Sequence, residues 1–160
     1  MKVKFLATSG IIAALYIAIT MLVAPFGFTE VQFRISEMFN HLVAFNPRFA
    51  IGVVMGVLIS NIFSPLGMYD LVFGVGHSVI TLTIFILICK FVKNILARLI
   101  LNSLLFTFTM FIIAFELNLA LELPFFWTWV TCAAGEFVVM IIGVPIMYAL
   151  NKRLNFKNLI

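Results

Sequence analysis

Long runs of apolar residues limit this chain to folds that a membrane can hold. Hydrophobic residues make up 64% of its 160 residues and charged residues only 10%, whereas a soluble domain carries about 25% charged residues. Polar surface therefore cannot cover a globule of this composition in water. In a bilayer, only α-helices and closed β-barrels satisfy the backbone hydrogen bonds. The runs lack the alternation of apolar and polar residues that barrel strands show, so we expect helices.

The apolar runs predict an all-α membrane protein, a bundle of six transmembrane helices in one domain, residues 1–160. A spanning helix needs about 20 apolar residues. Two runs on either side of Asn46-Pro47-Arg48 are shorter, so we expect them to form a tilted hairpin that does not fully cross. The first run is too long for a cleaved signal peptide. The six runs are Phe5–Val23, Met38–Phe45, Phe49–Phe63, Leu71–Phe91, Leu99–Leu121 and Phe125–Leu150.

The positions of the cations predict the orientation. With six spans and a cytoplasmic N-terminus, nine of the ten Lys and Arg residues lie on the cytoplasmic side, and Arg34 alone lies outside. Lys and Arg near the ends of spans set the orientation of membrane proteins. We therefore expect a multi-pass protein of the plasma membrane with both termini in the cytoplasm. The nine cations are Lys2, Lys4, Arg48, Lys90, Lys93, Arg98, Lys152, Arg153 and Lys157.

Several classes of site have no pattern in this sequence. Cys89 and Cys132 fall in separate apolar runs without a CxxC or Cys/His cluster, so we expect buried thiols and neither a disulfide nor a metal site. HExxH, GxSxG and P-loop motifs are missing as well. We expect no cofactor and no ATP hydrolysis by this chain, and interpret the net charge of +4 as membrane topology, not nucleic-acid binding.

Ionisable residues inside the apolar runs are the candidate site. Each costs about 2.5–3.5 kcal/mol near the bilayer centre and usually faces a cavity or the bundle interior. Asp70 and His77 share one helix face by their spacing, and Glu136 is the deepest acid. The alternatives are an N-cap role for Asp70, a histidine bonded to a neighbouring helix for His77, and a packing carboxyl for Glu136. Glu116 shares a face with two other polar residues, Asn102 and Thr109.

Small residues repeat every fourth position in the first run, at Gly10, Ala14 and Ala18. Such a stripe lets another helix approach closely. The partner is either a helix of the same chain or a separate membrane subunit.

Three segments carry a resemblance to a known family. They are QFRISE at Gln32–Glu37, the stretch Phe45–Gly67, and YDLVFGVGHSVITL at Tyr69–Leu82. They resemble the substrate-binding (S) components of energy-coupling factor (ECF) transporters, and among these the QueT family; the second half of the chain is similar mainly in hydropathy. The resemblance implies a six-helix bundle that binds a queuosine precursor, a 7-deazaguanine. It also implies a transmembrane coupling subunit, which the small-residue stripe would contact, and two cytoplasmic ATPases.

The resemblance also implies that the loop after the first helix acts as a lid, with Arg34 and Glu37 closing over or holding the ligand. A guanine-like ring presents adjacent N–H donors that one carboxylate can accept together. A cationic aminomethyl arm would favour a second carboxylate, and aromatic rings could stack on the base. The first candidates are Glu37, Asp70 and Glu136. The full expected substrate-binding set is Arg34, Glu37, Asn40, Asp70, Phe73, His77, Glu116, Trp127 and Glu136.

Three other functions stay open from the sequence. The first is an S component for another vitamin or a pyrimidine precursor. The second is an integral-membrane enzyme that uses His77, Glu136 and Asp70, and the third is a scaffold in which polar residues only bridge helices. The transport interpretation depends on the buried acids converging on one chamber that faces the exterior.

Overall fold

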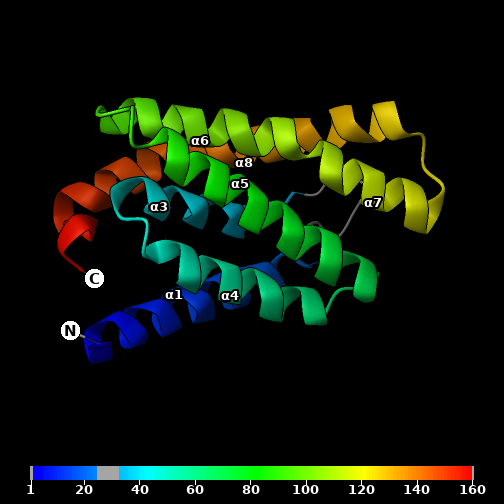
Figure 1. Cartoon of the computed structure of the whole chain (residues 1–160). Helices are drawn as coiled ribbons and strands as arrows, with labels where there is room; N and C mark the ends of the chain where they lie inside the picture. The colour runs from blue at the N-terminus through cyan, green and yellow to red at the C-terminus, as the bar shows by residue number, and fades with distance from the viewer. Residues whose placement is uncertain (1, 25–32, 160) are drawn as a thin grey trace.

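The computed structural model describes residues 2–24 and 33–159, and this part of the chain is helical without a β-strand (Figure 1). The lid expected after the first helix includes residues 25–32, among them Gln32, which lie outside the described residues. The elements are α1 (Lys2–Leu22), the 3-10 helix η1 (Ile35–His41), α3 (Leu42–Phe45), α4 (Phe49–Ile62), the π-helical turn η2 (Asp70–Gly74), α5 (Val75–Ile88), α6 (Ile95–Thr109), α7 (Phe111–Leu121), α8 (Phe125–Leu154) and the 3-10 helix η3 (Phe156–Asn158).

Four helices of the described part are long and apolar enough to cross a membrane: Val3–Leu22, Asp70–Ile88, Ile95–Leu121 and Phe125–Leu154. They match four of the six predicted runs, which confirms the all-α membrane class. Helix α4 is shorter, with 14 residues. The combined helix of η1 and α3 is about 20 Å long from its rise per residue, less than the ~30 Å hydrocarbon core. The predicted hairpin is therefore present as two short helical arms.

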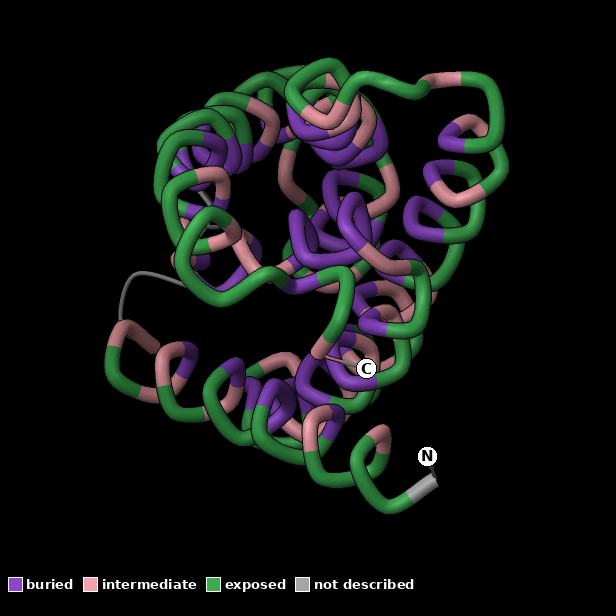
Figure 2. Tube along the Cα trace, turned by 90° about the vertical axis from the view of Figure 1, so that its left-hand side faces the viewer, coloured by how far each residue is buried: buried purple, intermediate pink, exposed green. Residues whose placement is uncertain are grey.

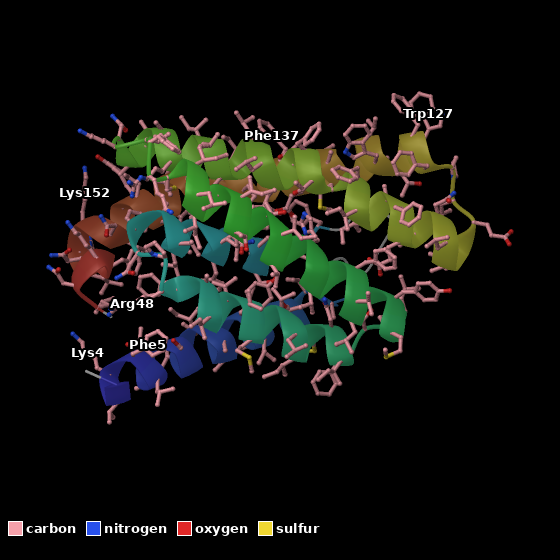
Figure 3. The ribbon with its side chains drawn as sticks, viewed as in Figure 1. Lys4, Phe5, Arg48, Trp127, Phe137 and Lys152 are labelled. Atoms are coloured by element: carbon pink, nitrogen blue, oxygen red, sulfur yellow. The ribbon has the colours of Figure 1, made fainter. Side chains whose placement is uncertain are left out.

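Both termini lie at the same end of the bundle (Figure 1). The Nζ atom of Lys4 donates a hydrogen bond of 3.0 Å to the backbone oxygen of Asn158, so the first turn of α1 touches the C-terminal segment. Figure 3 shows Arg48 and Lys152 at this end, and Trp127 at the opposite end. The chain therefore crosses the bundle an even number of times.

Arg98 fastens three segments together at that same end. Its guanidinium donates to the backbone oxygens of Val92 at 2.7 Å, Cys89 at 2.8 Å and Ala44 at 3.2 Å. The end of α3, the connection after α5 and the start of α6 are thereby held side by side. The cation satisfies carbonyl groups that a helix end leaves without partners.

An apolar core fills the end of the bundle near the termini. Phe156 of η3 packs on Phe45 and Phe49, with ring centroids 5.3 and 6.1 Å apart, and these rings belong to one buried cluster with Phe85 and Phe106. Figure 2 shows buried residues turned toward the centre of the bundle and exposed residues turned outward. This pattern suits a bundle whose outer surface lies in lipid.

Glycines of α4 let it pack closely on α1. A Cβ atom added at Gly56 would lie 2.7 Å from the Cβ atom of Tyr16, and one added at Gly52 would lie 2.9 Å from the carbonyl oxygen of Ser9. Helix α1 therefore uses the face with Ser9, Ile12 and Tyr16 against its own chain, and this close approach is typical of small-residue contacts between membrane helices.

The predicted small-residue stripe of α1 lies on the other face. Gly10, Ala14 and Ala18 are all exposed, and a Cβ atom at Gly10 would meet nothing within 4 Å. Of the two partners that the sequence left open, the described helices of the same chain do not cover this stripe.

We predict that Gly56→Ala destabilises the bundle, because the added methyl group collides with Tyr16. Overpacking of this kind costs about 1–3 kcal/mol, which thermal unfolding of the purified chain in detergent would measure. The matched control is Gly76→Ala in α5, where a Cβ atom meets nothing within 4 Å and the better helix propensity of alanine should be neutral or stabilising. An equal loss of stability in both variants would contradict the proposed packing.

Candidate functional site

The guanidinium of Arg34 lies at the centre of the buried polar residues. Its Nη2 atom forms an ion pair of 3.2 Å with Oδ1 of Asp70, and its Nη1 atom donates to Oδ1 of Asn61 at 3.0 Å. Among the described residues Arg34 is the one buried Lys or Arg, while four acidic side chains are buried as well. These acids are Glu37, Asp70, Glu116 and Glu136.

Asp70 is held in place by the π-helical turn and by the end of α4. Nδ2 of Asn61 donates to the backbone oxygen of Asp70 at 2.9 Å, and the Ser64 hydroxyl donates to its Oδ2 atom. A Cβ atom at Gly74 would lie 2.4 Å from Nδ2 of Asn61, so glycine leaves the room that this amide needs. The carboxylate of Asp70 thus binds side chains of other segments, which favours an ion-pair role over the N-cap alternative. π-Helical turns of this kind are frequent at functional sites.

Glu37 of η1 is bound by two neutral donors. The Tyr16 hydroxyl donates to its Oε1 atom and Nδ2 of Asn40 donates to its Oε2 atom, both at 2.5 Å. Asn40 therefore orients Glu37. A further bond of 2.7 Å between the hydroxyls of Thr20 and Ser36 joins η1 to α1. These contacts fix the position of the Glu37 carboxylate relative to α1.

Glu116 of α7 and Glu136 of α8 are buried without full hydrogen bonding. Neither Oε atom of Glu116 has a hydrogen-bond partner among the described residues, and Oε1 of Glu136 has none either. Both carboxyl groups interact electrostatically with Arg34, Glu116 also with Asp70, and Glu136 also with Glu37. The four acids thus surround one cation.

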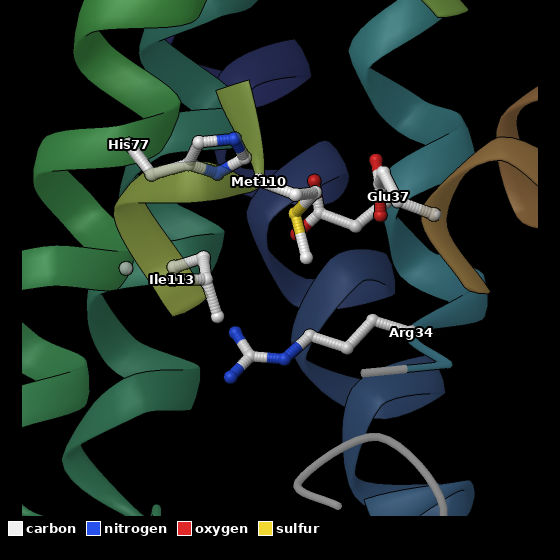
Figure 4. Close-up of a pocket in the computed structure, with 7 residues that line it drawn as sticks. Arg34, Glu37, His77, Met110 and Ile113 are labelled. Carbon is white, nitrogen blue, oxygen red and sulfur yellow. The ribbon is translucent and has the colours of Figure 1, made fainter. Parts of the chain in front are cut away.

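A small cavity of about 10 Å³ lies inside this cluster, which is room for roughly one water molecule. Figure 4 shows Met110 and Ile113 projecting into the space between His77, Glu37 and Arg34. Pockets for small molecules usually have about 300–1,000 Å³, so a two-ring ligand must displace side chains that fill the site. The cavity is lined by Arg34, Glu37, Gly74, His77, Met110, Ile113 and Glu136.

Only two of the four buried acids line the cavity, whereas the sequence analysis expected the acids to converge on one chamber. Glu37 and Glu136 face the cavity together. Asp70 and Glu116 do not line it, and they reach it only through their interactions with Arg34.

His77 both lines the cavity and bonds to a neighbouring helix. Its Nε2 atom lies 2.9 Å from the hydroxyl oxygen of Thr109 in α6, which also accepts from Thr81 at 2.9 Å. The His77 ring packs edge-on against the Phe106 ring, with the two ring centroids 5.4 Å apart. His77 therefore makes the bond to a neighbouring helix that the sequence left as an alternative, and its ring also lines the cavity.

The two aromatic candidates lie away from the cavity. Phe73 packs edge-on against Phe115 at 5.9 Å and lines a separate apolar groove with Phe111 and Phe125. Trp127 lies near the start of α8, is 67% exposed, and has its ring centroid 5.9 Å from that of Phe126. Such exposure is typical of an aromatic residue at the membrane–water interface.

Sequence reasoning missed Tyr16, Asn61, Ser64 and Met110. The amide of Asn61 inside the apolar run Phe49–Phe63 was the available signal, because a polar side chain there needs a partner. The described residues contain no group of three or more His, Cys, Asp and Glu side chains suited to a metal ion. The arrangement offers charge and hydrogen bonds to an organic ligand.

Comparison with known proteins identifies a family of transporters. A family model described as "QueT transporter" matches residues 6–152. A protein of Lactococcus lactis subsp. cremoris (strain MG1363), described as "Queuosine precursor transporter QueT", is 35% identical over 165 residues, which cover 98% of this chain and 97% of that protein. No solved structure matches the chain.

We predict that Arg34→Met destabilises the chain more than Asp70→Asn does. The first change leaves four buried acids without their cation and should cost about 3–5 kcal/mol, whereas the second removes part of the acidic excess and should cost about 1–3 kcal/mol. Unfolding of the purified variants in detergent would measure both. Glu122→Gln, at an exposed acid, serves as the control and should stay within about 0.5 kcal/mol. Equal losses at Arg34 and Asp70 would mean that only the ion pair matters.

Proposed function

Because the chain belongs to the QueT transporter family, we propose that it is the substrate-binding subunit of an ECF-type transporter that captures a 7-deazaguanine precursor of queuosine outside the cell. The observation that carries this proposal is the cavity lined by Arg34, Glu37 and Glu136 inside an apolar bundle. Buried ionisable groups in a membrane helix bundle mark a ligand or ion path. The description of the relative as a queuosine precursor transporter supports the choice of ligand.

The chemistry of the cavity suits such a ring. Glu37 is held by Tyr16 and Asn40, and a carboxylate has about four lone-pair sites, so it retains capacity for the adjacent N–H donors of a guanine-like edge. Met110 is unbranched and flexible, so its side chain can move aside for the ring. His77, Asp70 and Glu116 complete the surroundings through hydrogen bonds and charge, whereas Phe73 and Trp127 are the least supported members of the expected set.

We further propose that partner subunits supply the energy. The resemblance to ECF S components implies that a transmembrane coupling subunit and two cytoplasmic ATPases would drive uptake, and the sequence itself has no P-loop. The exposed stripe of Gly10, Ala14 and Ala18 is the proposed contact with the coupling subunit, because it lets a helix of that subunit approach closely.

The proposed topology has six crossings in the plasma membrane with both termini cytoplasmic. The short arms η1–α3 and α4 form the second and third crossings. Because the two chain ends are adjacent, the number of crossings is even. The cations near these ends favour an orientation with both termini on the cytoplasmic side.

The direct test is uptake of a radiolabelled 7-deazaguanine by cells that carry the chain together with a coupling module and lack any other route. We expect accumulation that depends on ATP and on this chain, and a loss of at least about tenfold for Arg34→Met, because the acids would repel one another and distort the cavity. Cells with the coupling module alone are the control. No uptake by a fully assembled complex would overturn the proposed substrate.

Replacing Ala14 by Leu should separate assembly from binding. The larger side chain blocks close helix approach on the exposed face of α1, so copurification with the coupling subunit should fall sharply, while ligand binding by the isolated chain stays unchanged. Ala134→Leu places the same bulk on an exposed position of α8 and should leave copurification intact. Retained assembly in the Ala14 variant would rule out this contact face.

A further inference from the structure

The helix η1 carries two rows of side chains with different partners. Residues three apart are eclipsed in a 3-10 helix, so Glu37 and Asn40 form one row, and Met38 and His41 form another. In the first row, Nδ2 of Asn40 donates to Glu37, which lines the cavity. The second row lies against α8, where His41 is fully buried outside the cavity lining. The contacts of the second row therefore fix the direction in which the first row points.

Helix α8 meets this second row along the face that carries Glu136. Glu136, Met140 and Gly143 are spaced by four and three residues, so they share one face of the helix. Nε2 of His41 lies 2.8 Å from the backbone oxygen of Met140. A Cβ atom added at Gly143 would lie 2.9 Å from the Cβ atom of Met38 and 3.1 Å from Cδ2 of His41. Glycine at this position thus lets η1 dock closely on α8.

The two partners of His41 define its tautomer. A carbonyl oxygen only accepts hydrogen bonds, so Nε2 of His41 carries the proton and donates to Met140. The other ring nitrogen, Nδ1, lies 3.4 Å from Nδ2 of Asn102 in α6, and this amide donates to it. A neutral ring with its proton on Nε2 satisfies both contacts. His41 therefore links η1, α8 and α6 in the buried interior.

We propose that His41 is a positioning residue of the ligand site, which docks η1 on α8 and thereby sets the distance between Glu37 and Glu136 across the cavity. This inference rests on the proposed function and adds a residue that does not itself touch the ligand. The two acids lie on the two elements that the His41 bond joins, so a shift or rotation of η1 moves one acid relative to the other. Binding groups must be held within about 0.5 Å of the productive geometry, and loss of this bond should therefore weaken binding.

Calorimetric titration of the purified full chain with 7-aminomethyl-7-deazaguanine tests this role. His41→Leu removes both ring nitrogens and should raise the dissociation constant about tenfold or more. His41→Gln keeps an N–H donor near the end of the side chain and should restore most of the affinity. Gly143→Ala keeps His41 but wedges η1 away from α8, so it should weaken binding as His41→Leu does. The matched control is Gly76→Ala, where a Cβ atom meets nothing within 4 Å, and its affinity should equal that of the unaltered chain.

The same titration separates positioning from a loss of folded protein. A partly unfolded sample has fewer binding sites per chain at an unchanged dissociation constant. A displaced Glu37 instead raises the dissociation constant of a sample in which every chain still binds. We expect the second result for His41→Leu and Gly143→Ala, and the first result in both variants would overturn the positioning role.

A second measurement needs no ligand. The chain has two histidines, so nitrogen NMR of protein with isotope-labelled histidine shows two rings, and comparison with His41→Gln assigns the signals of His41. We expect a neutral ring with its proton on Nε2 in the unaltered chain. A proton on Nδ1, or on both ring nitrogens, would overturn the docking bond.

The outcomes separate this inference from the proposed function. Unchanged affinity in folded His41→Leu and Gly143→Ala, or equal weakening in His41→Leu and His41→Gln, would overturn the role of the His41 bond and leave the proposed function standing. No binding by the unaltered, folded chain would overturn the proposed function and the positioning role with it. If His41→Leu does not fold, the Gly143→Ala titration and the NMR measurement still decide the role of His41.

Discussion

The ion pair between Arg34 and Asp70 is the interaction on which the rest of the site depends. It joins the residue before η1 to the π-helical turn before α5, and Asn61 connects both partners to the end of α4. Three segments that are far apart in the sequence thereby meet inside an apolar bundle. Because a buried charge without a partner is strongly destabilising, these segments cannot separate without a large cost in free energy, and the pair fixes where the other acids stand relative to the cation.

The bundle has an apolar region near the termini and a polar region farther from them. Near the termini, aromatic rings such as Phe45, Phe49 and Phe156 form a packed core, and Arg98 binds the loop carbonyls there. Away from that core, the bundle encloses carboxyl groups with unused acceptors. A region that binds ligand often gives up stability for the sake of function. The apolar core supplies the stability that lets the polar region remain partly unsatisfied.

Hydropathy predicted the helical membrane class and most of the spans, because burial of about 20 apolar residues in lipid leaves little choice of structure. It also predicted that polar residues inside the runs would turn inward. It could not predict the partners of these residues, since Tyr16 and Asn61 come from helices whose relative rotation depends on the packing of Gly52 and Gly56. Asn102, Thr109 and Glu116 are all buried, as their predicted shared face requires. Hydropathy did not predict the break between α6, which ends at Thr109, and α7, which begins at Phe111.

The break between α6 and α7 bears on how a ligand enters. Met110 stands between the two helices and lines the cavity together with Ile113 of α7. On the α6 side, Thr109 is held by His77 and Thr81, so this wall is fixed. On the α7 side, Glu116 interacts with Asp70 and Arg34. A ligand larger than the cavity of about 10 Å³ would have to displace side chains that line it. The unbranched, flexible side chain of Met110 has no hydrogen-bonding role here, so it is the lining group whose displacement costs least.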